Sequence, residues 1–280
     1  EVVRADEVDG HNEYNVAIAT RRLRRLFSTA CHLSIDILKL NCPGVVYMRG
    51  GDAVSGDIHA ELRETNELAS IPAVMSLANE EIRGLEVLAE AVGKVWVISV
   101  PGNHGRTTVK PVSKNYVGLN YELILADILE RHFKAKGDQR VQFWTPRSGD
   151  AYFEVFGQRL LLTHGDRIGS RGGQGFIGPI ATIIRGIEKV RRQYATWGQI
   201  IDRVFTGHLH TSAEPPHGFA NGSLIGFNQY ARDIRANPEP PQQWLVHVHP
   251  EWGITSRWPI LLQDPPPRKF TADVVGGFGE

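Results

Sequence analysis

Residues 95–104 read Val-Trp-Val-Ile-Ser-Val-Pro-Gly-Asn-His, a run of β-type residues that ends in a turn carrying an amide and an imidazole. Three more such runs, at 45–48, 160–162 and 204–205, lead into Gly51-Asp52, Thr163-His164-Gly165-Asp166 and Gly207-His208-Leu209-His210. Together the four blocks offer two carboxylates, one amide and four imidazoles, each close to the end of a strand. This pattern indicates a ligand set for two divalent metal ions.

Around these blocks the chain changes character from one half to the other. The first half alternates strands and amphipathic helices, and the second half is rich in strands. Helices are expected over 12–40 (capped by Asn12), 61–92 (with Pro72 at a break or a new first turn), 118–134 and 179–195. Strands are expected over 44–48, 94–100, 141–145, 151–156, 159–163, 200–206, 223–227, 244–249 and 254–258.

This order of elements predicts an α/β (α+β) fold, a two-layer β-sandwich flanked by α-helices. Residues 1–263 are expected to form a single domain, since no repeat and no convincing linker interrupts them. The tail from 264 to 280, rich in proline and glycine, is expected to be disordered.

Composition narrows the class of protein. With 280 residues, 41% of them hydrophobic, the chain can bury a sizeable core. Lys+Arg and Asp+Glu are equal at 31 each, so no overall basic bias indicates nucleic acid. No apolar run reaches the roughly 18 residues of a membrane span, and Cys31 and Cys42 lack the spacing of metal ligands. We therefore expect a cytoplasmic protein with reduced thiols and no membrane association.

The ligand set suits the hydrolysis of phosphate esters. Two metal ions about 3.5–4 Å apart can clamp phosphoryl oxygens and lower the pKa of a bridging water. Asp52 is the best candidate for a carboxylate between the ions. The remaining ligands are expected to be Asn103, His164, His208 and His210. His104 directly follows a ligand, so we expect it to face the leaving group as a general acid.

The blocks Gly-Asp, Gly-Asn-His, His-Gly and Gly-His-x-His, in this order over roughly residues 44 to 228, resemble the calcineurin-like metallophosphoesterase family. The resemblance implies that Asp52 bridges the ions, that Asn103 and His164 ligate one ion, and that His208 and His210 serve one ion each. It also implies His104 as the general acid and a β-sandwich flanked by helices. Mn²⁺ is the expected metal, with Fe, Zn and Ni as alternatives.

One block departs from the family. The family opens with a hydrophobic strand ending in Asp-x-His, which supplies two ligands to the first ion. Asp9-Gly10-His11 has this spelling, but only Val2-Val3-Arg4-Ala5 and two acidic residues precede it. Three interpretations stay open: the block lies upstream of this sequence, Asp9 and His11 are the ligands, or the block is lost. In the first case this polypeptide would hold the second ion better than the first.

Further residues have two interpretations each. Arg106 is expected to bind a substrate phosphate, with a surface arginine as the alternative. Asp166 orients His164 or simply forms a turn, and His59 lies at the rim of the site or starts a helix. The glycine-rich residues 169–178 form a lid or a loose connection.

The substrate is expected to be a phosphodiester. Gly51-Asp52-Ala53-Val54-Ser55-Gly56-Asp57 and Gly105 lack the arginine and the glutamate typical of protein serine/threonine phosphatases. Arg21–Arg25 and Arg185–Arg192 would suit a polyanion. The chain is also similar to uncharacterised metallophosphoesterases of phage and bacterial genomes, for which a nuclease role is inferred by analogy, so DNA and a small nucleotide both stay open as substrates. The alternative is a non-catalytic scaffold, as in a retromer subunit of this family, which the presence of His104 disfavours. The sequence does not predict the oligomeric state.

Overall fold

The computed structural model describes residues 1–168 and 179–264. The expected lid or connection at 169–178 and the expected disordered tail beyond Asp264 lie outside the described residues, so both stay predictions.

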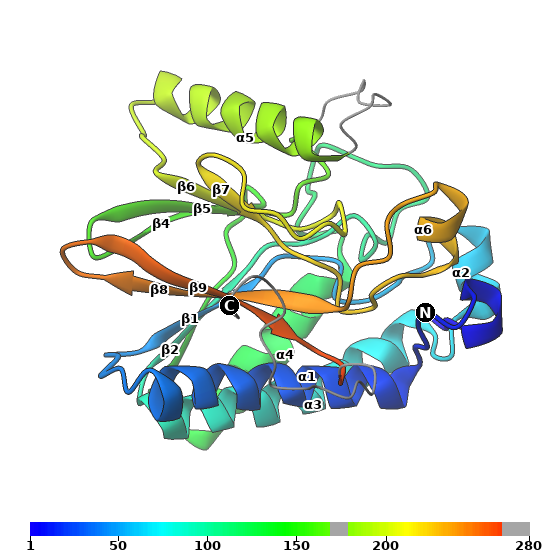
Figure 1. Cartoon of the computed structure of the whole chain (residues 1–280), viewed down its shortest axis with the longest axis horizontal. Helices are drawn as coiled ribbons and strands as arrows, with labels where there is room; N and C mark the ends of the chain where they lie inside the picture. Colours follow the sequence, from blue (N-terminus) through cyan, green and yellow to red (C-terminus); the bar gives the residue numbers. More distant parts are fainter. Residues whose placement is uncertain (169–178, 265–280) are drawn as a thin grey trace, which may run out of the picture.

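Helices and strands follow one another along the chain as the figures label them (Figure 1). The helices are a 3₁₀ helix at Ala5–Val8, α1 (Val16–Cys31) continued by a π-helix at His32–Ile37, α2 (Ala60–Thr65), α3 (Ser70–Val92), α4 (Tyr121–Lys136), α5 (Pro179–Thr196) and α6 (Gln229–Asp233). The strands are β1 (Val45–Arg49), β2 (Val95–Ser99), β3 (Val141–Trp144), β4 (Asp150–Val155), β5 (Gln158–Thr163), β6 (Arg203–Thr206), β7 (Gly218–Ala220), β8 (Gln242–His249) and β9 (Gly253–Leu261).

Three sheets contain these strands. The first has the order β1-β2-β3 and is parallel. The second has the order β4-β5-β6-β7, in which β4 is antiparallel to β5 while β5, β6 and β7 are parallel. The third is the antiparallel hairpin β8-β9. The strands β1, β2, β5 and β6 are thus the four that end directly before the four sequence blocks.

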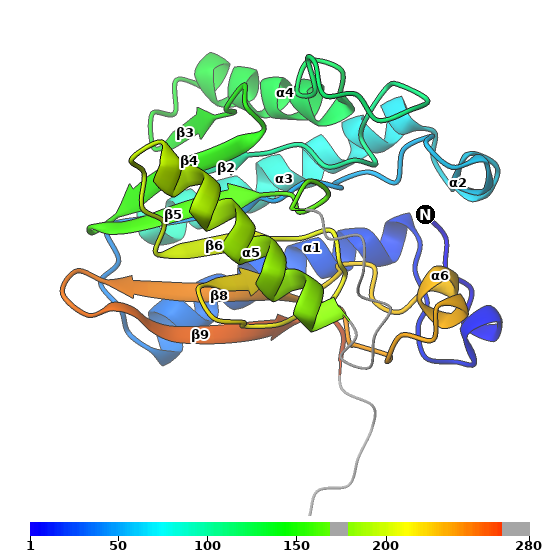
Figure 2. The same ribbon diagram turned by 90° about the horizontal axis from the view of Figure 1, so that it is seen from above.

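Apolar side chains from the sheets meet in one cluster between them. Its buried members are Ile98, Val100, Ala151, Leu160, Leu162, Phe205 and Phe219, with Val46, Met48 and Trp244 packed against them. Helices α1, α3 and α4 cover the other face of the first sheet (Figure 2), where Leu23, Leu85, Leu125 and Val97 share a second cluster. Ile183 and Ile187 of α5 pack on Leu161 and Val204 of the second sheet. The fold is therefore of the mixed α/β class, as expected.

Two details near the N-terminus differ from the prediction. Helix α1 begins at Val16, and its cap is Asn15, whose side chain accepts a hydrogen bond from the Ile18 N–H. The predicted cap, Asn12, is instead buried and donates to the carbonyls of Ile225 and Phe227. Both asparagines precede an apolar helical pattern, so the pattern alone does not distinguish the cap from a tertiary contact.

The predicted strand at 223–227 is wrong. The strand of this region is β7, five residues earlier. At 223–227 the Ser223 hydroxyl accepts from the N–H groups of Ile225 and Gly226, and Gly226 has a φ of +80°. Buried Arg22 takes the carbonyls of Leu224 and Ile225. These side-chain bonds replace a strand ladder, and β-type residues give no sign of them.

Membrane association was not expected. Within residues 1–168 and 179–264, no helix combines the length and the apolar character needed to cross a membrane.

Candidate metal centre

Close backbone contacts hold the first block in place. Gly51 and Asp52 both lie in the left-handed region, with φ of +90° and +56°. This reversal presses the loop after β1 against the loop after β2, since a methyl group on Gly102 would overlap the backbone nitrogen and Oδ1 of Asp52. A methyl group on Gly51 would lie only 2.6 Å from His164 Nδ1. The glycines therefore let the two loops approach.

The second block is held by the start of α4. The Asn120 side chain caps this helix by accepting from the Glu122 N–H and donates from Nδ2 to the carbonyl of Gly102 over 2.7 Å. The backbone N–H of His104 donates to Asp52 Oδ1 over 2.8 Å. Asn103 is therefore held on both sides, because Asn120 bonds to the residue before it and Asp52 to the residue after it.

The third and fourth blocks follow two paired strands. His164 is only 2% exposed, and its carbonyl accepts from the Thr206 hydroxyl. His208 and His210 both have left-handed backbones, with φ of +65° and +52°. This conformation is uncommon for residues with a side chain and is concentrated at functional sites. Asp52, His208 and His210 are thus three predicted ligands with a left-handed backbone conformation.

Acceptor atoms from the four blocks converge on one point. His164 Nδ1 is 2.8 Å from the Gly50 carbonyl and must donate to it, which leaves Nε2 with a lone pair in the neutral ring. This Nε2 lies 3.0 Å from Asp52 Oδ2 and 3.1 Å from Asn103 Oδ1. The ligand atoms of Asp52, His164 and His208 all lie within 4.8 Å of one another.

Three acceptors facing each other repel unless a positive charge lies between them. Among the described residues, the buried Oδ2 of Asp52 also has no hydrogen bond of good geometry, despite its short distance to the imidazole. Carboxylate, amide and imidazole donors are a set that transition metals and zinc accept. The donor set therefore fits a divalent cation.

The electrostatics agree with this interpretation. Burial lowers the pKa of His164, but the hydrogen bond and charge of Asp52 outweigh it and raise the pKa to about 9. Burial raises the pKa of Asp52, and the contacts with His164 and His104 outweigh it, giving a pKa of about 2. Without a metal, a proton on His164 thus supplies the missing positive charge.

The two histidines of the fourth block behave differently. Burial, and then the charge of His164, lower the pKa of His208 to about 4, and burial also lowers the pKa of His210. Both rings are therefore neutral at neutral pH and have a free lone pair for a metal. His210 lines the same cavity as Asp52 and His104 but is outside the three-residue cluster.

His104 is fixed beside this cluster. Its Nδ1 is 2.9 Å from the Ser55 carbonyl, so this nitrogen carries a proton and Nε2 is the nitrogen free for other contacts. The ring centroids of His104 and His59 are 5.7 Å apart. His59 is also the N-cap position of α2, so it starts a helix, as one of its two interpretations predicted, while its ring lies close to that of the predicted general acid.

Arg106 and Asp166, which were predicted to contact the substrate and to orient His164, make other contacts. The Arg106 guanidinium donates to the carbonyls of Asn103, Thr108 and Val109, so it fastens the loop that carries Asn103. A phosphate contact by Arg106 stays a prediction. Asp166 accepts from the hydroxyl of Tyr116 rather than from His164.

Asp9 and His11 lie elsewhere. Asp9 pairs with Arg232 at 3.1 Å, and the ring of exposed His11 packs edge-on against Phe227. The structure therefore argues against these two residues as metal ligands.

Two residues that support the centre, Asn120 and Glu122, were not predicted from the sequence. Glu122 is buried, and its carboxylate accepts from the N–H of Ala53, next to Asp52. Burial and the charge of Asp52 raise its pKa to about 7. An asparagine before an amphipathic helix is a cap signal that could have identified Asn120, whereas a glutamate in a first helical turn is too common to mark a buried site.

Comparison with models of protein families and with curated proteins found no match. The chemistry of the centre must therefore be inferred from its own residues.

Proposed function

We propose that this protein is a metal-dependent phosphoester hydrolase of the calcineurin-like metallophosphoesterase type, with two divalent ions, Mn²⁺ being the first candidate. The convergence of Asp52, Asn103, His164 and His208 from four strand ends carries this proposal. The apolar cluster between the facing sheets, with helices outside, supports the two-layer sandwich that this type requires.

The residues of the chain divide the work. When bound, the ions polarise the phosphoryl group and lower the pKa of a coordinated water. Asp52, Asn103, His164 and His208 would hold one ion, and Asp52 together with His210 would reach the other. The Gly50 carbonyl keeps His164 in the tautomer that presents Nε2.

His104 is proposed as the general acid. Since its Nδ1–H is held by the Ser55 carbonyl, only Nε2 can exchange a proton with a substrate. In the protonated ring, Nε2–H would donate that proton to the departing alkoxide. The backbone bond from His104 to Asp52 keeps the ring next to the centre.

The proposed substrate is a phosphodiester, either DNA or a small nucleotide. The arginine run on α1 gives DNA little support, because three of its four members are engaged within the protein. The fourth, Arg21, is exposed and has no hydrogen bond or ion pair to another described residue. Arg24 is paired with Glu80 and Arg25 with Asp264, while Arg22 is buried among carbonyls. Assays with single-stranded DNA, duplex DNA and cyclic nucleotides would separate these substrates.

The test is hydrolysis of bis-p-nitrophenyl phosphate with Mn²⁺ by the wild type, Asp52→Ala and His104→Ala. Activity that needs the metal and is lost in both variants supports the proposal. His11→Ala is the matched control, since it removes an imidazole from the Asp-x-His spelling that lies outside the centre. Metal binding by calorimetry without any turnover would favour the scaffold alternative and overturn the proposal. Absence of both would reject the metal centre.

A further inference from the structure

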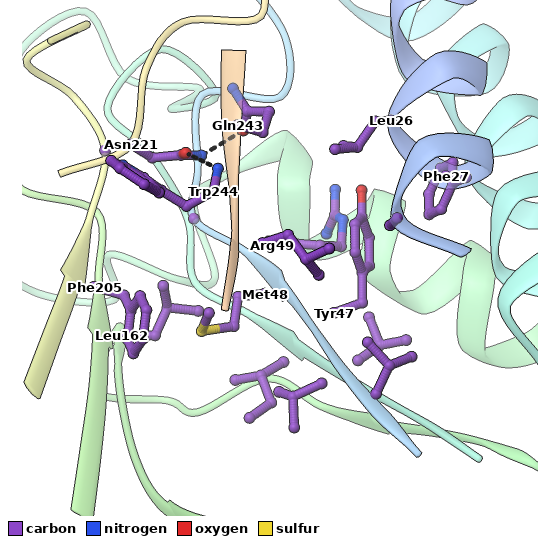
Figure 3. Close-up of a pocket in the computed structure, with 18 of the residues that line it drawn as sticks. Leu26, Phe27, Tyr47, Met48, Arg49, Leu162, Phe205, Asn221, Gln243 and Trp244 are labelled. Carbon is purple, nitrogen blue, oxygen red and sulfur yellow. Dashed lines mark hydrogen bonds between the residues drawn. The ribbon is translucent and has the colours of Figure 1, made fainter. Parts of the chain in front are cut away.

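A large apolar groove lies between β1 and β8 (Figure 3). The cavity that contains this groove also reaches Asp52 and His104 of the metal centre, and its volume is about 1530 Å³, above the roughly 300–1,000 Å³ of small-molecule pockets. The walls include Leu26, Phe27, Met48, Leu162, Phe205 and Trp244. A groove of this size and composition needs an apolar occupant, because contact of these side chains with water costs free energy.

The two strands that flank the groove lie in one layer. On one side, Met48 of β1 and Trp244 of β8 pack against the cluster between the sheets. On the other side, Tyr47 of β1 contacts Phe27 of α1, and His247 of β8 bonds to Ser34 in the π-helix that continues α1. The groove is therefore an interruption within a layer of strands, covered on both faces.

The edge of β1 that faces the groove has unpaired backbone groups. The strand pairs with β2 alone among the described residues. Val45 donates to Lys94, and Arg49 accepts from Val100, so the odd-numbered residues of this parallel ladder bond to β2. The N–H and C=O groups of the even-numbered residues, Val46 and Met48, consequently point the other way.

The even-numbered residues of β8 also point away from the neighbouring strand of their hairpin, but two of their N–H groups already have partners in the segment 221–223. The N–H groups of Gln242 and Trp244 point away from β9, since they donate to Ser223 and Asn221. Pro259, which lacks an N–H, is the residue of β9 opposite Trp244, as expected at a position without ladder bonds. The alternation continues to Val246, ahead of the irregularity at His247 and Val248.

Arg49, at the end of β1, has a buried donor that needs a hydrogen-bond acceptor. Its Nε bonds to Glu81 and its Nη1 to Ser99, but the buried Nη2 has no hydrogen-bond partner among the described residues. Arg49 also lines the groove. A buried donor without an acceptor is costly, so an occupant with an acceptor near this end would be favoured.

We propose that the groove receives an extended apolar peptide strand, which inserts between β1 and β8 and forms backbone hydrogen bonds with both edges. Because both faces of the layer are covered, the inserted strand is a continuous apolar run with a hydroxyl or carbonyl acceptor near Arg49. A lipid would fill the volume but would leave the amides of Val46, Met48 and Val246 unpaired. This distinction favours a peptide.

The probe is the peptide acetyl-Lys-Val-Ile-Val-Val-Ser-Lys-amide, added in EDTA so that the result is independent of metal chemistry. Amide hydrogen exchange is followed by NMR. We expect the peptide to protect the N–H groups of Val46 and Met48, and to leave those of Val45 and Tyr47, already bonded to β2, unchanged. Fusing the same peptide ahead of Glu1, which also lines the groove, makes the insertion intramolecular and should increase the protection.

The control is the same peptide N-methylated at alternate residues, which keeps the side chains and removes the donors of one edge. Losing two or three backbone bonds should weaken binding by about tenfold or more. Equal affinity of the two peptides would overturn the proposal. It would also fail if neither the free nor the fused peptide changed the exchange, or if palmitate bound in place of the peptide. Protection of Val46 in a dimer of the protein without peptide would assign the groove to a second copy.

Discussion

His164 and Gly50 are joined by a hydrogen bond of 2.8 Å between Nδ1 and the backbone carbonyl, across loops that are 114 residues apart in sequence. This bond fixes the tautomer of a nearly inaccessible imidazole and presents Nε2 to Asp52 and Asn103. The Gly50 carbonyl, in the loop after β1, thus determines which ring nitrogen of His164, in the loop after β5, is available as a ligand.

The first prediction concerns metal affinity. His164→Gln should weaken Mn²⁺ binding by at least about a hundredfold, since loss of the partners that merely orient a ligand already costs about 10- to 100-fold. Calorimetric titration of the dialysed protein measures this. His11→Ala should leave the affinity unchanged, and an equal loss in both variants would contradict the assigned centre.

The second prediction compares two glycines next to proposed ligands. Gly102→Ala should lower the free energy of unfolding by about 1–3 kcal/mol, because the added methyl group overlaps Asp52. Gly207→Ala should be tolerated, since the nearest atom to its new methyl group would lie 3.7 Å away. Urea denaturation with both variants checks the difference, and equal stability of the two would refute the close approach of the loops.

The third prediction is a pH dependence of stability. The pKa of Glu122 is raised by burial to about 7 in the folded state, from an ordinary value of 4.5. The stabilisation that its protonated form provides is complete below pH 4.5 and decreases as the pH rises to about 7. Glu122→Gln keeps the shape and removes this loss, so it should gain up to about 3 kcal/mol over the wild type across that window.

Denaturation midpoints in EDTA at several pH values test this difference. The internal control is the same pair of proteins below pH 4.5, where the carboxyl group of Glu122 is neutral in both states and the difference should be smallest. A difference that does not change with pH would show that this carboxyl group is not perturbed.

The fourth prediction tests the role of His104 through the leaving group. A general acid contributes about 10²–10⁴-fold when the leaving group is a poor one. His104→Asn should therefore impair cleavage of an alkyl phosphodiester much more than that of a p-nitrophenyl diester, whose leaving group needs little protonation. Values of kcat for both substrates give the ratio. The same loss for both would indicate a role in binding instead.

The fifth prediction separates the two asparagines at the start of α1. Asn15→Asp keeps an acceptor for the Ile18 N–H, so its stability should change little. Asn12→Ala removes the donor to the carbonyls of Ile225 and Phe227 and the acceptor of buried Arg22, and should destabilise by about 1–3 kcal/mol. Thermal denaturation measures both. Reversed sensitivities would restore Asn12 as the cap.

The sequence predicted which residues the structure brings together because they lie in short blocks, each directly after an apolar strand. Asp52 and Asn103 follow the parallel pair β1 and β2, and His164 and His208 follow the parallel pair β5 and β6. The apolar cluster between these two sheets brings the two pairs of residues together. The contacts of Asp166 were not predictable, since its partner, Tyr116, is 50 residues away and belongs to a loop.

Contacts between residues distant in sequence also explain the errors in the predicted secondary structure. The segment 223–227 has the composition of a strand, yet Arg22 binds its carbonyls from 202 residues away. Local propensity describes what a segment prefers alone, and a buried arginine can outweigh it. Asn12 was mistaken for a cap for the same reason.

Asn120 connects the start of α4 to the carbonyl of Gly102, directly before Asn103. The ends of helices open more readily than their centres. Fraying of the first turn of α4 would therefore release the loop that carries Asn103. His164 and His208 follow other strands and would keep their positions. The N-terminal end of α4 would then control how quickly an ion at the proposed centre exchanges with solvent.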